Sequence, residues 1–185
     1  MNESADTLTL DEFILEMNRE KVGAMTHGRL MELTHRLALS HELIERRTCF
    51  AANTYARNLV CRTADFELLV LCWKQGHQST IHDHAGSLNA IHVHRGELTS
   101  RVFAPAADRP ASAGPVELIA EERVTGDGWT GVDREGIHQL ANTAAEDLVT
   151  VHVYAPPLMS LTVYSTESPE VELQPLRDTI ADDLT

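Results

Sequence analysis

Two histidines in the run Ile81-His82-Asp83-His84 carry the clearest chemical signal of this sequence. Residues two apart on a strand point to the same face, so His82 and His84 can both reach one metal ion. A third histidine, His138, lies far downstream, just before another strand-like run. This pattern predicts a metal held inside a β-barrel by His82, His84 and His138, and it favours an enzyme that handles oxygen. Imidazole suits Fe, Ni, Cu and Zn, so the ligand type alone does not select the metal.

A second group of polar residues alternates with valines in Thr150-Val151-His152-Val153-Tyr154. Thr150, His152 and Tyr154 therefore share one face of a strand. That face either meets solvent or lines a pocket. In an enclosed barrel, His152 and Tyr154 could hydrogen-bond to each other, and the tyrosine hydroxyl would then serve as an acid or hydrogen-bond donor beside the metal.

Tyr55 and Arg57 form another pair on one strand face. The planar guanidinium of arginine is the natural bidentate partner of a carboxylate. Such an arginine is more often a surface residue, so its proposed role in substrate binding depends on the resemblance described below.

These residues must be positioned by a barrel that follows a helical segment. Residues 1–48 are predicted to be helical, because Thr9 and Glu12 fit a capping box and a second apolar pattern runs from about Thr26 to Arg46. Short β-rich runs separated by Gly, Pro, Asn and Asp follow from residue 50: 58–61, 66–73, 89–93, 98–103, 116–119, 148–154 and 161–164. We expect a single, mainly β domain: a cupin (jelly-roll) barrel over 50–170 and a C-terminal tail over 171–185. Within it, 104–115 is expected to be an exposed loop, and 178–185 is expected to fray.

The spacing of glycines and histidines supports a cupin barrel more specifically. Gly76, His82, His84 and Gly96 stand where the first cupin motif requires them, whereas Asn89 replaces its glutamate. The second motif ends in a histidine and an asparagine, as do residues 138–142. Without the glutamate, three neutral imidazoles would leave a divalent ion with its full charge and open positions. Such a centre favours an anionic ligand and would deprotonate a bound thiol.

Strand parity sorts the remaining histidines. If Ile91 and Val93 point into the barrel, Asn89 does too, while His92 and His94 point out as a surface pair. The rival interpretation makes His92 and His94 metal ligands but exposes the two apolar residues. By the same parity, His77 and Asp83 point away from the metal, and a hydrogen bond near the strand end is expected for Asp83. We interpret the helical residues His27, His35 and His41 as surface or helix-terminal histidines.

The composition excludes several function classes. The chain has 185 residues and a formal net charge of -13, which disfavours nucleic acid and anionic membranes as partners. Neither a signal peptide nor an apolar run of about 20 residues is present in the sequence. The cysteines Cys49, Cys61 and Cys72 are odd in number and lack paired spacing, which is typical of reduced thiols in a cytoplasmic protein. A small molecule is the expected partner, and the oligomeric state stays open.

Taken in order along the chain, these motifs resemble the cysteine dioxygenase family of thiol dioxygenases. The matching pieces span about residues 55–157, and Arg57-Asn58-Leu59-Val60 and residues 152–157 are the most specific of them. The resemblance implies Fe(II) on His82, His84 and His138, with O2 as co-substrate. Ni(II) or another divalent ion is the alternative metal.

The resemblance also assigns roles around the metal. It implies that cysteine chelates the iron through its thiolate and amine, and that both oxygen atoms are added to sulfur to give a sulfinate. Arg57, helped by Tyr55, would hold the substrate carboxylate. Tyr154 would lie over the thiolate and O2, oriented by His152 and then Thr150. Family members that act on mercaptopropionate carry Gln where this chain has Arg57, so an α-amino thiol is favoured.

Two departures from the family lie beside the metal ligands. Asn89 takes the place of the cysteine that eukaryotic members link to the active-site tyrosine, and of the glycine usual in bacterial members. Leu88 replaces a residue that is commonly polar. These changes keep two alternatives open: a tailoring enzyme that gives another S-oxidised product, such as a sulfonamide or an aldehyde, and a non-catalytic cupin that binds a metal or ligand.

Overall fold

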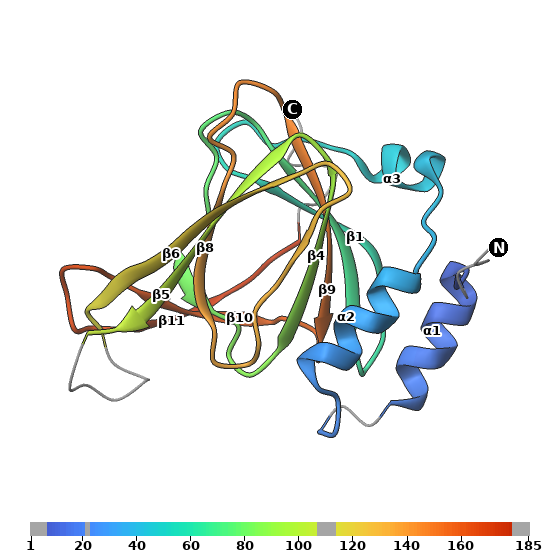
Figure 1. Ribbon diagram of the computed structural model, residues 1–185, viewed down its shortest axis with the longest axis horizontal. Helices are drawn as coiled ribbons and strands as arrows, with labels where there is room; N and C mark the ends of the chain where they lie inside the picture. The colour runs from blue at the N-terminus through green and yellow to red at the C-terminus, as the bar shows by residue number, and fades with distance from the viewer. Residues whose placement is uncertain (1–6, 21–22, 107–113, 179–185) are drawn as a thin grey trace, which may run out of the picture.

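Two antiparallel sheets that face each other form the body of the protein, as seen in the computed structural model (Figure 1). The structure describes residues 7–20, 23–106 and 114–178. The five-stranded sheet has the order β1-β2-β9-β4-β7, from Ala56–Arg62, Glu67–Trp73, Leu148–Ala155, Leu88–Arg95 and Trp129–Thr130. The six-stranded sheet has the order β11-β10-β3-β8-β5-β6, from Glu172–Pro175, Ser160–Tyr164, Ile81–Asp83, Ile137–Ala141, Glu97–Pro105 and Val116–Thr125. This architecture confirms the mainly β barrel expected from the sequence.

The five-stranded sheet is covered on both faces, which explains its continuous apolar runs. Every residue of β2 and β9 is buried. Leu69 and Leu71 pack toward Tyr154 in the barrel interior, whereas Val151 and Val153 pack into the cluster that contains the helical residues. Because neighbouring residues point to opposite faces, β9 can place polar side chains inside the barrel and valines against the helices.

Three helices cover the outer face of the five-stranded sheet: α1 (Leu10–Arg19), α2 (His27–Arg36) and α3 (His41–Arg47) (Figure 1). The capping box predicted at Thr9 and Glu12 is confirmed. The single helix expected over 26–46 is wrong, because the chain leaves the helical conformation between Arg36 and His41. There, the backbone N–H of Ala38 donates to Leu8 at 2.9 Å, and Ser40 caps α3 as a separate helix.

Every β-rich run expected from the sequence forms part of a strand, and the strand expected to carry His82 and His84 forms as β3 but ends at Asp83. Three short strands, β7, β8 and β11, were not expected, because none of them contains a run of three or more apolar or β-branched residues. The expected strand over 116–119 continues to Thr125, and β11 lies in the segment expected as a tail. The expected loop over 104–115 begins within β5, and its residues 107–113, like residues 179–185 of the fraying segment, lie outside the described part of the chain.

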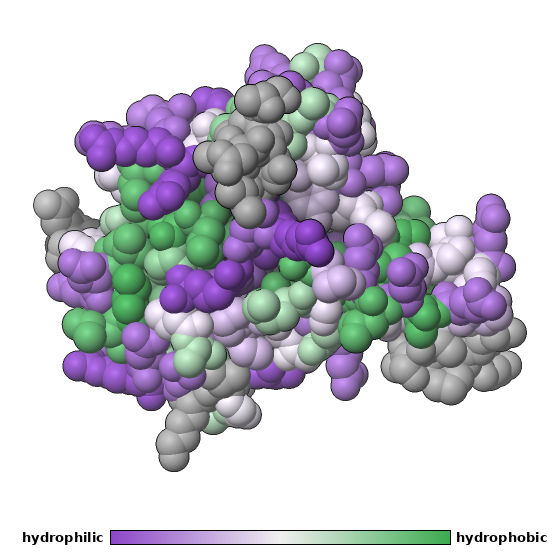
Figure 2. Space-filling model, turned by 180° about the vertical axis from the view of Figure 1, so that it is seen from behind, coloured by the Kyte–Doolittle hydropathy of each residue, from purple (hydrophilic) through white to green (hydrophobic). Residues whose placement is uncertain are grey.

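The surface opposite to the view of Figure 1 mixes apolar and strongly polar side chains (Figure 2). Among the helices that the structure describes, none combines the length and apolar character needed to cross a membrane.

Cys49, Cys61 and Cys72 are all free thiols, and Cys72 is buried as expected for a small apolar residue.

Candidate metal centre

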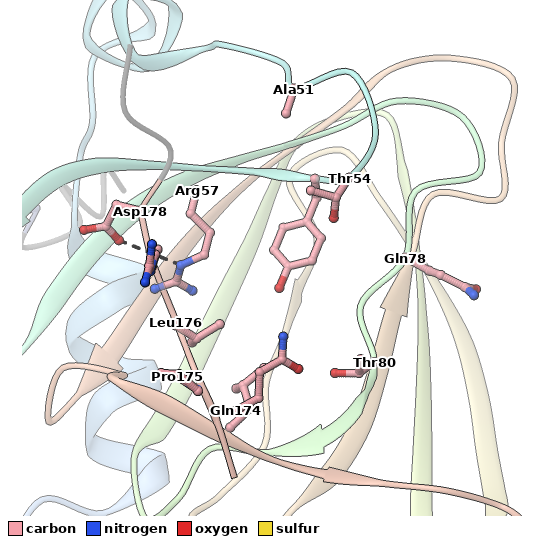
Figure 3. Close-up of a pocket in the computed structure, with 12 residues that line it drawn as sticks. Ala51, Thr54, Arg57, Gln78, Thr80, Gln174, Pro175, Leu176 and Asp178 are labelled. Atoms are coloured by element: carbon pink, nitrogen blue, oxygen red, sulfur yellow. Dashed lines mark ion pairs between the residues drawn. The ribbon is translucent and has the colours of Figure 1, made fainter. Parts of the chain in front are cut away.

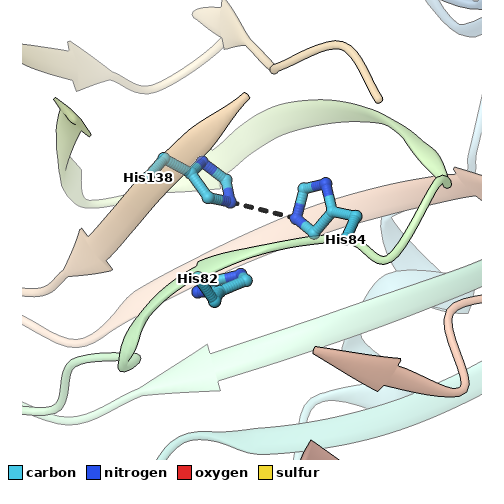
Figure 4. A group of neighbouring side chains, drawn as sticks. All are labelled: His82, His84 and His138. Atoms are coloured by element: carbon cyan, nitrogen blue, oxygen red, sulfur yellow. Dashed lines mark hydrogen bonds between the residues drawn. The ribbon is translucent and has the colours of Figure 1, made fainter. Parts of the chain in front are cut away.

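The three predicted ligands converge inside the barrel from two neighbouring strands (Figure 4). His82 on β3 pairs in register with His138 on β8, and His84 follows directly after the end of β3. One ring nitrogen from each residue lies within 4.8 Å of the others, and all three residues are buried. The prediction that His82, His84 and His138 form one cluster is therefore met by the geometry.

The electrostatics of this cluster suit a cation. Burial, the largest cause, lowers the pKa of His82 to about 4. Burial followed by repulsion from neighbouring histidines holds the pKa of His84 and His138 well below the usual value. The three imidazoles are consequently neutral at pH 7, which is the form that binds a metal.

Hydrogen bonding leaves the ring nitrogens of the cluster ready for a metal. The Thr80 carbonyl can only accept, so His82 Nδ1, 2.8 Å away, carries the proton and leaves Nε2 to bind a metal. His84 Nε2 and His138 Nε2 face each other at 3.0 Å, and His84 Nδ1 is buried without a hydrogen-bond partner among the described residues. No fourth His, Cys, Asp or Glu joins this group within the described ranges, so the donor set fits an ion with open positions.

A hydrogen-bonded chain runs along β9 toward the histidine cluster. Trp73 Nε1 donates to Thr150 Oγ1 at 3.0 Å, Thr150 Oγ1 lies 2.9 Å from His152 Nε2, and His152 Nδ1 lies 3.1 Å from the Tyr154 hydroxyl. Because Thr150 accepts the indole N–H, it can donate its own proton to His152 Nε2. His152 Nδ1 then donates to Tyr154, whose hydroxyl proton is left to point toward a ligand.

The protonation states of His152 and Tyr154 keep that chain in place. Burial and then the charge of Arg57 lower the pKa of His152 to about 3. Burial is also the main cause that raises the pKa of the Tyr154 phenol well above its usual value. Near neutral pH, His152 is a neutral imidazole and Tyr154 a hydrogen-bond donor. The Tyr154 ring centroid is 5.2 Å from that of His84, so the phenol lies beside the metal cluster.

Arg57 lies close to Tyr154 and is held by a buried acid. Its Cζ is 5.8 Å from the Tyr154 ring centroid, and its Nη2 donates to Glu67 Oε1 at 3.1 Å. Glu67 is fully buried and also accepts from Arg62 at 2.6 Å and from the backbone N–H of Leu158 at 3.1 Å. The arginine expected to hold a substrate carboxylate thus already has a carboxylate partner within the protein.

A cavity of about 490 Å³ borders this arginine. Tyr55 and Arg57 line it together with Thr80, Gln174 and Asp178 (Figure 3). The C-terminal segment runs past Arg57 here, and Asp178 Oδ1 lies 3.8 Å from Arg57 Nε. Tyr55 stacks on Trp73 with 4.2 Å between ring centroids, which fixes this wall of the cavity.

Asn89 lies deeper in the barrel, opposite Tyr154 in the register of β4 and β9. Its Nδ2 donates to the Val153 carbonyl at 3.4 Å. Its Oδ1 is buried and has no hydrogen-bond partner among the described residues. The predicted inward parity of Asn89 with Ile91 and Val93 is confirmed, because these two side chains pack in the interior cluster.

The residues that strand parity excluded as metal ligands lie away from the metal cluster, as expected. Asp83 accepts from the Tyr164 hydroxyl at 2.7 Å, at the end of β3. His77 accepts from the backbone N–H of Lys74 at 3.2 Å. His92 and His94 lie on the outer face of β4, where His92 stacks on Trp129 and His94 lies beside His41. The interpretation that His92 and His94 join the metal is therefore wrong.

The family model described as Cysteine dioxygenase type I matches residues 17–167, most of the chain. The chain belongs to the cysteine dioxygenase type I family. The matched region includes all three histidines of the cluster.

Individual members of the cysteine dioxygenase type I family are distant. The rat and human proteins named Cysteine dioxygenase type 1 are 33% and 34% identical to this chain over 107 residues, which is 56% of this chain and 52% of each relative. The zebrafish protein of that name (Danio rerio) is 32% identical over 111 residues, 57% of this chain and 53% of the relative. The chain thus matches about half the length of these curated relatives.

Solved structures support the fold of this cysteine dioxygenase family member. A Klebsiella pneumoniae protein with a double-stranded β-helix domain has a TM-score of 0.53 at 15% identity and covers 69% of this chain and 91% of its own. A Thermus thermophilus protein has a TM-score of 0.51 at 17% identity, with 62% and 94% covered. These likenesses show the double-stranded β-helix fold of the cupins and carry nothing about activity.

Three residues near the site of this family member were not predicted from its sequence: Glu67, Thr80 and Gln174. Glu67 could have been found, because it is the one charged residue within the apolar run 66–73, and a charge in a central strand needs a buried partner. Thr80 contributes only its backbone carbonyl to His82, and Gln174 reaches the cavity through the unexpected strand β11. No sequence signal identifies either of these roles.

Proposed function

We propose that this protein is a metal-dependent thiol dioxygenase that oxidises the sulfur of cysteine or a close analogue. The thiol and one O2 give a sulfinic acid: two S–O bonds form, the sulfur loses four electrons, and O2 accepts them. The observation that carries the proposal is that Tyr154 lies close both to the histidine cluster and to Arg57. Its ring is 5.2 Å from that of His84 and 5.8 Å from the Arg57 guanidinium carbon. One small amino-acid thiol can therefore contact the metal centre, the phenol and the guanidinium together.

An iron(II) ion would be held by His82, His84 and His138, as in the family that the chain resembles. When bound, such an ion supplies a positive centre that keeps a thiol in its thiolate form and brings it together with O2. The triad contributes no negative charge of its own. The ion would therefore keep its full positive charge, which favours an anionic ligand such as a thiolate.

The remaining side chains would orient the substrate and O2. Arg57, beside Tyr55 in the cavity wall, would bind the substrate carboxylate through charge-assisted hydrogen bonds. The Tyr154 hydroxyl would donate to the bound sulfur or oxygen, oriented by the chain from Trp73 through Thr150 and His152. Because the phenol stays protonated, this donor is available throughout the neutral pH range.

A product other than sulfinate is the second candidate, and Asn89 is the observation that favours it. Its Oδ1 is buried without a partner in the described part of the chain, opposite Tyr154. An amide oxygen in this position would accept a hydrogen bond from a substrate group and could redirect oxidation to another S-oxidised product. A non-catalytic metal or ligand carrier is less favoured, because such a protein has no need for Tyr154 and Arg57 to meet beside the triad.

Anaerobic reconstitution with Fe(II), Ni(II) or no metal tests the proposal. Each form is mixed with O2 and a panel of thiols, and oxygen uptake and product mass are measured. We expect uptake only with metal, fastest with cysteine, and a product equal to cysteine plus two oxygen atoms. Uptake with a different product mass would support the second candidate, and no uptake with any thiol and metal would leave only the non-catalytic function.

A further inference from the structure

A second cluster of histidines lies on the outside of the barrel, between α3 and β4. His92 and His94 project there from β4, because they alternate with residues that point inward. His41 lies beside His94 at the start of α3, with 5.5 Å between ring centroids. None of these histidines has a part in the proposed oxidation.

The geometry of three of these side chains resembles a metal site. His41 and Glu45 are four residues apart on α3 and so share one helix face, which meets His94. One ligand atom from each residue lies within 4.8 Å of the other two. Two ligands that are each about 2.1 Å from a tetrahedral zinc ion are about 3.4 Å apart. Side-chain rotations that move each ligand atom by roughly 1 Å would bring the three atoms to that spacing, and the exposed His41 ring has room to turn.

Charged side chains of both signs flank this group. His41, His94, His92 and Asp127 all line a cavity of about 340 Å³. His92 Nε2 is 3.6 Å from Asp127 Oδ1, so that imidazole has an acidic neighbour. Arg95 Nη1 lies 3.3 Å from Glu45 Oε1, so a bound ion would share the Glu45 carboxylate with this guanidinium.

We propose that His41, Glu45 and His94 form a second divalent-cation site that ties α3 to the barrel. Two imidazoles and one carboxylate are the donors that zinc(II) prefers, and copper(II) and nickel(II) accept the same set. Water would complete the coordination, because the site is partly open to solvent. The ion would be structural, since the cluster lies on the outer face of the five-stranded sheet and Tyr154 and Arg57 lie on the inner side.

Zinc stoichiometry tests this site in the full-length protein. The chain is stripped with a chelator and dialysed against micromolar zinc(II), and bound zinc per chain is counted by mass spectrometry of the metal. The variants are His41→Gln and Glu45→Gln for the outer site and His84→Ala for the barrel triad. His77→Gln, which removes an imidazole elsewhere, is the matched control, and melting temperatures without metal establish that each variant is folded.

The deciding quantity is the zinc lost from the outer-site variants relative to the unaltered protein. We expect His41→Gln and Glu45→Gln each to lose one equivalent, His77→Gln to lose none, and His84→Ala to retain the outer equivalent. Zinc binding should also raise the melting temperature of His84→Ala, but not that of His84→Ala combined with His41→Gln. Unchanged stoichiometry in both outer-site variants, or complete loss of zinc in His84→Ala, would overturn the proposal.

Discussion

The guanidinium of Arg57 donates to the fully buried carboxylate of Glu67 at 3.1 Å, and Arg57 also lines the cavity of about 490 Å³. Glu67 also accepts from Arg62 and from the backbone N–H of Leu158. The Glu67 carboxylate therefore links β2 to β1 and to the turn after β9 through hydrogen bonds. This network fixes the direction from which Arg57 approaches Tyr154 and partly neutralises its charge before any substrate binds.

We expect Glu67→Gln to lower the free energy of unfolding by about 3 kcal/mol, because it removes the buried charge that Arg57 and Arg62 share. Asp178, 3.8 Å from Arg57 Nε, would remain as an acidic neighbour. Chemical denaturation measures the change. The matched control is Glu121→Gln, which breaks the exposed pair between Glu121 and Arg101 and should change the free energy by less than about 1 kcal/mol. Equal effects of the two substitutions would show that the buried network is not a stabilising feature.

Arg57→Ala should raise the KM for cysteine strongly while leaving thiols without a carboxylate, such as cysteamine, nearly unaffected. The lost interaction is a charge-assisted hydrogen bond to the carboxylate, worth roughly 1.5–3 kcal/mol, or about 10–150-fold in KM. Steady-state kinetics with both thiols measures the difference. If both thiols lost activity equally, Arg57 would be a structural residue.

Tyr154→Phe should lower kcat by about 10²- to 10⁴-fold, the range for a positioned proton donor, with little change in KM or metal content. Because the pKa of Tyr154 is raised well above its usual value, the hydroxyl keeps its proton at pH 6–9, and no loss of kcat from its ionisation is expected there. His152→Gln should cause a smaller loss, since it only orients the hydroxyl. Tyr164→Phe, which alters a tyrosine bonded to Asp83, should leave kcat unchanged, and an equal loss in that control would exclude a special role for Tyr154.

The stability of the metal-free protein should fall as the pH falls below about 6.5. The pKa of His152 is about 3 in the folded protein, whereas an unfolded histidine titrates near 6.5. Between these values only the unfolded chain binds the proton, so this one group lowers the free energy of unfolding by up to about 1.4 kcal/mol per pH unit. Urea titrations from pH 7 to pH 5 measure the slope, which should be shallower in His152→Gln. If that substitution left the pH dependence of the free energy of unfolding unchanged, His152 would not be a neutral, buried imidazole in the folded protein.

Much of the barrel and the metal centre could be predicted because both depend on local periodicity. The alternation of Thr150, His152 and Tyr154 survives in the fold, since β9 fixes which face each residue takes. His82 on β3 and His84 just after its end also meet as their two-residue spacing predicted. The break between α2 and α3 could not be predicted, because it depends on backbone pairing with Leu8, far away in sequence. The Glu67 network and the meeting of His41 with His94 also arise only when distant elements pack together.

We propose that both atoms of O2 are transferred to the sulfur of a thiol bound near the histidine triad and Arg57. This proposal is tested most directly by a single-turnover reaction of the Fe(II)-loaded protein with cysteine under isotopically labelled O2, followed by mass analysis of the product. We predict cysteine sulfinate that carries two labelled oxygen atoms, and none from His138→Ala, which lacks one ligand of the triad. A product with one labelled oxygen or none, or unchanged turnover in His138→Ala, would contradict the proposed function.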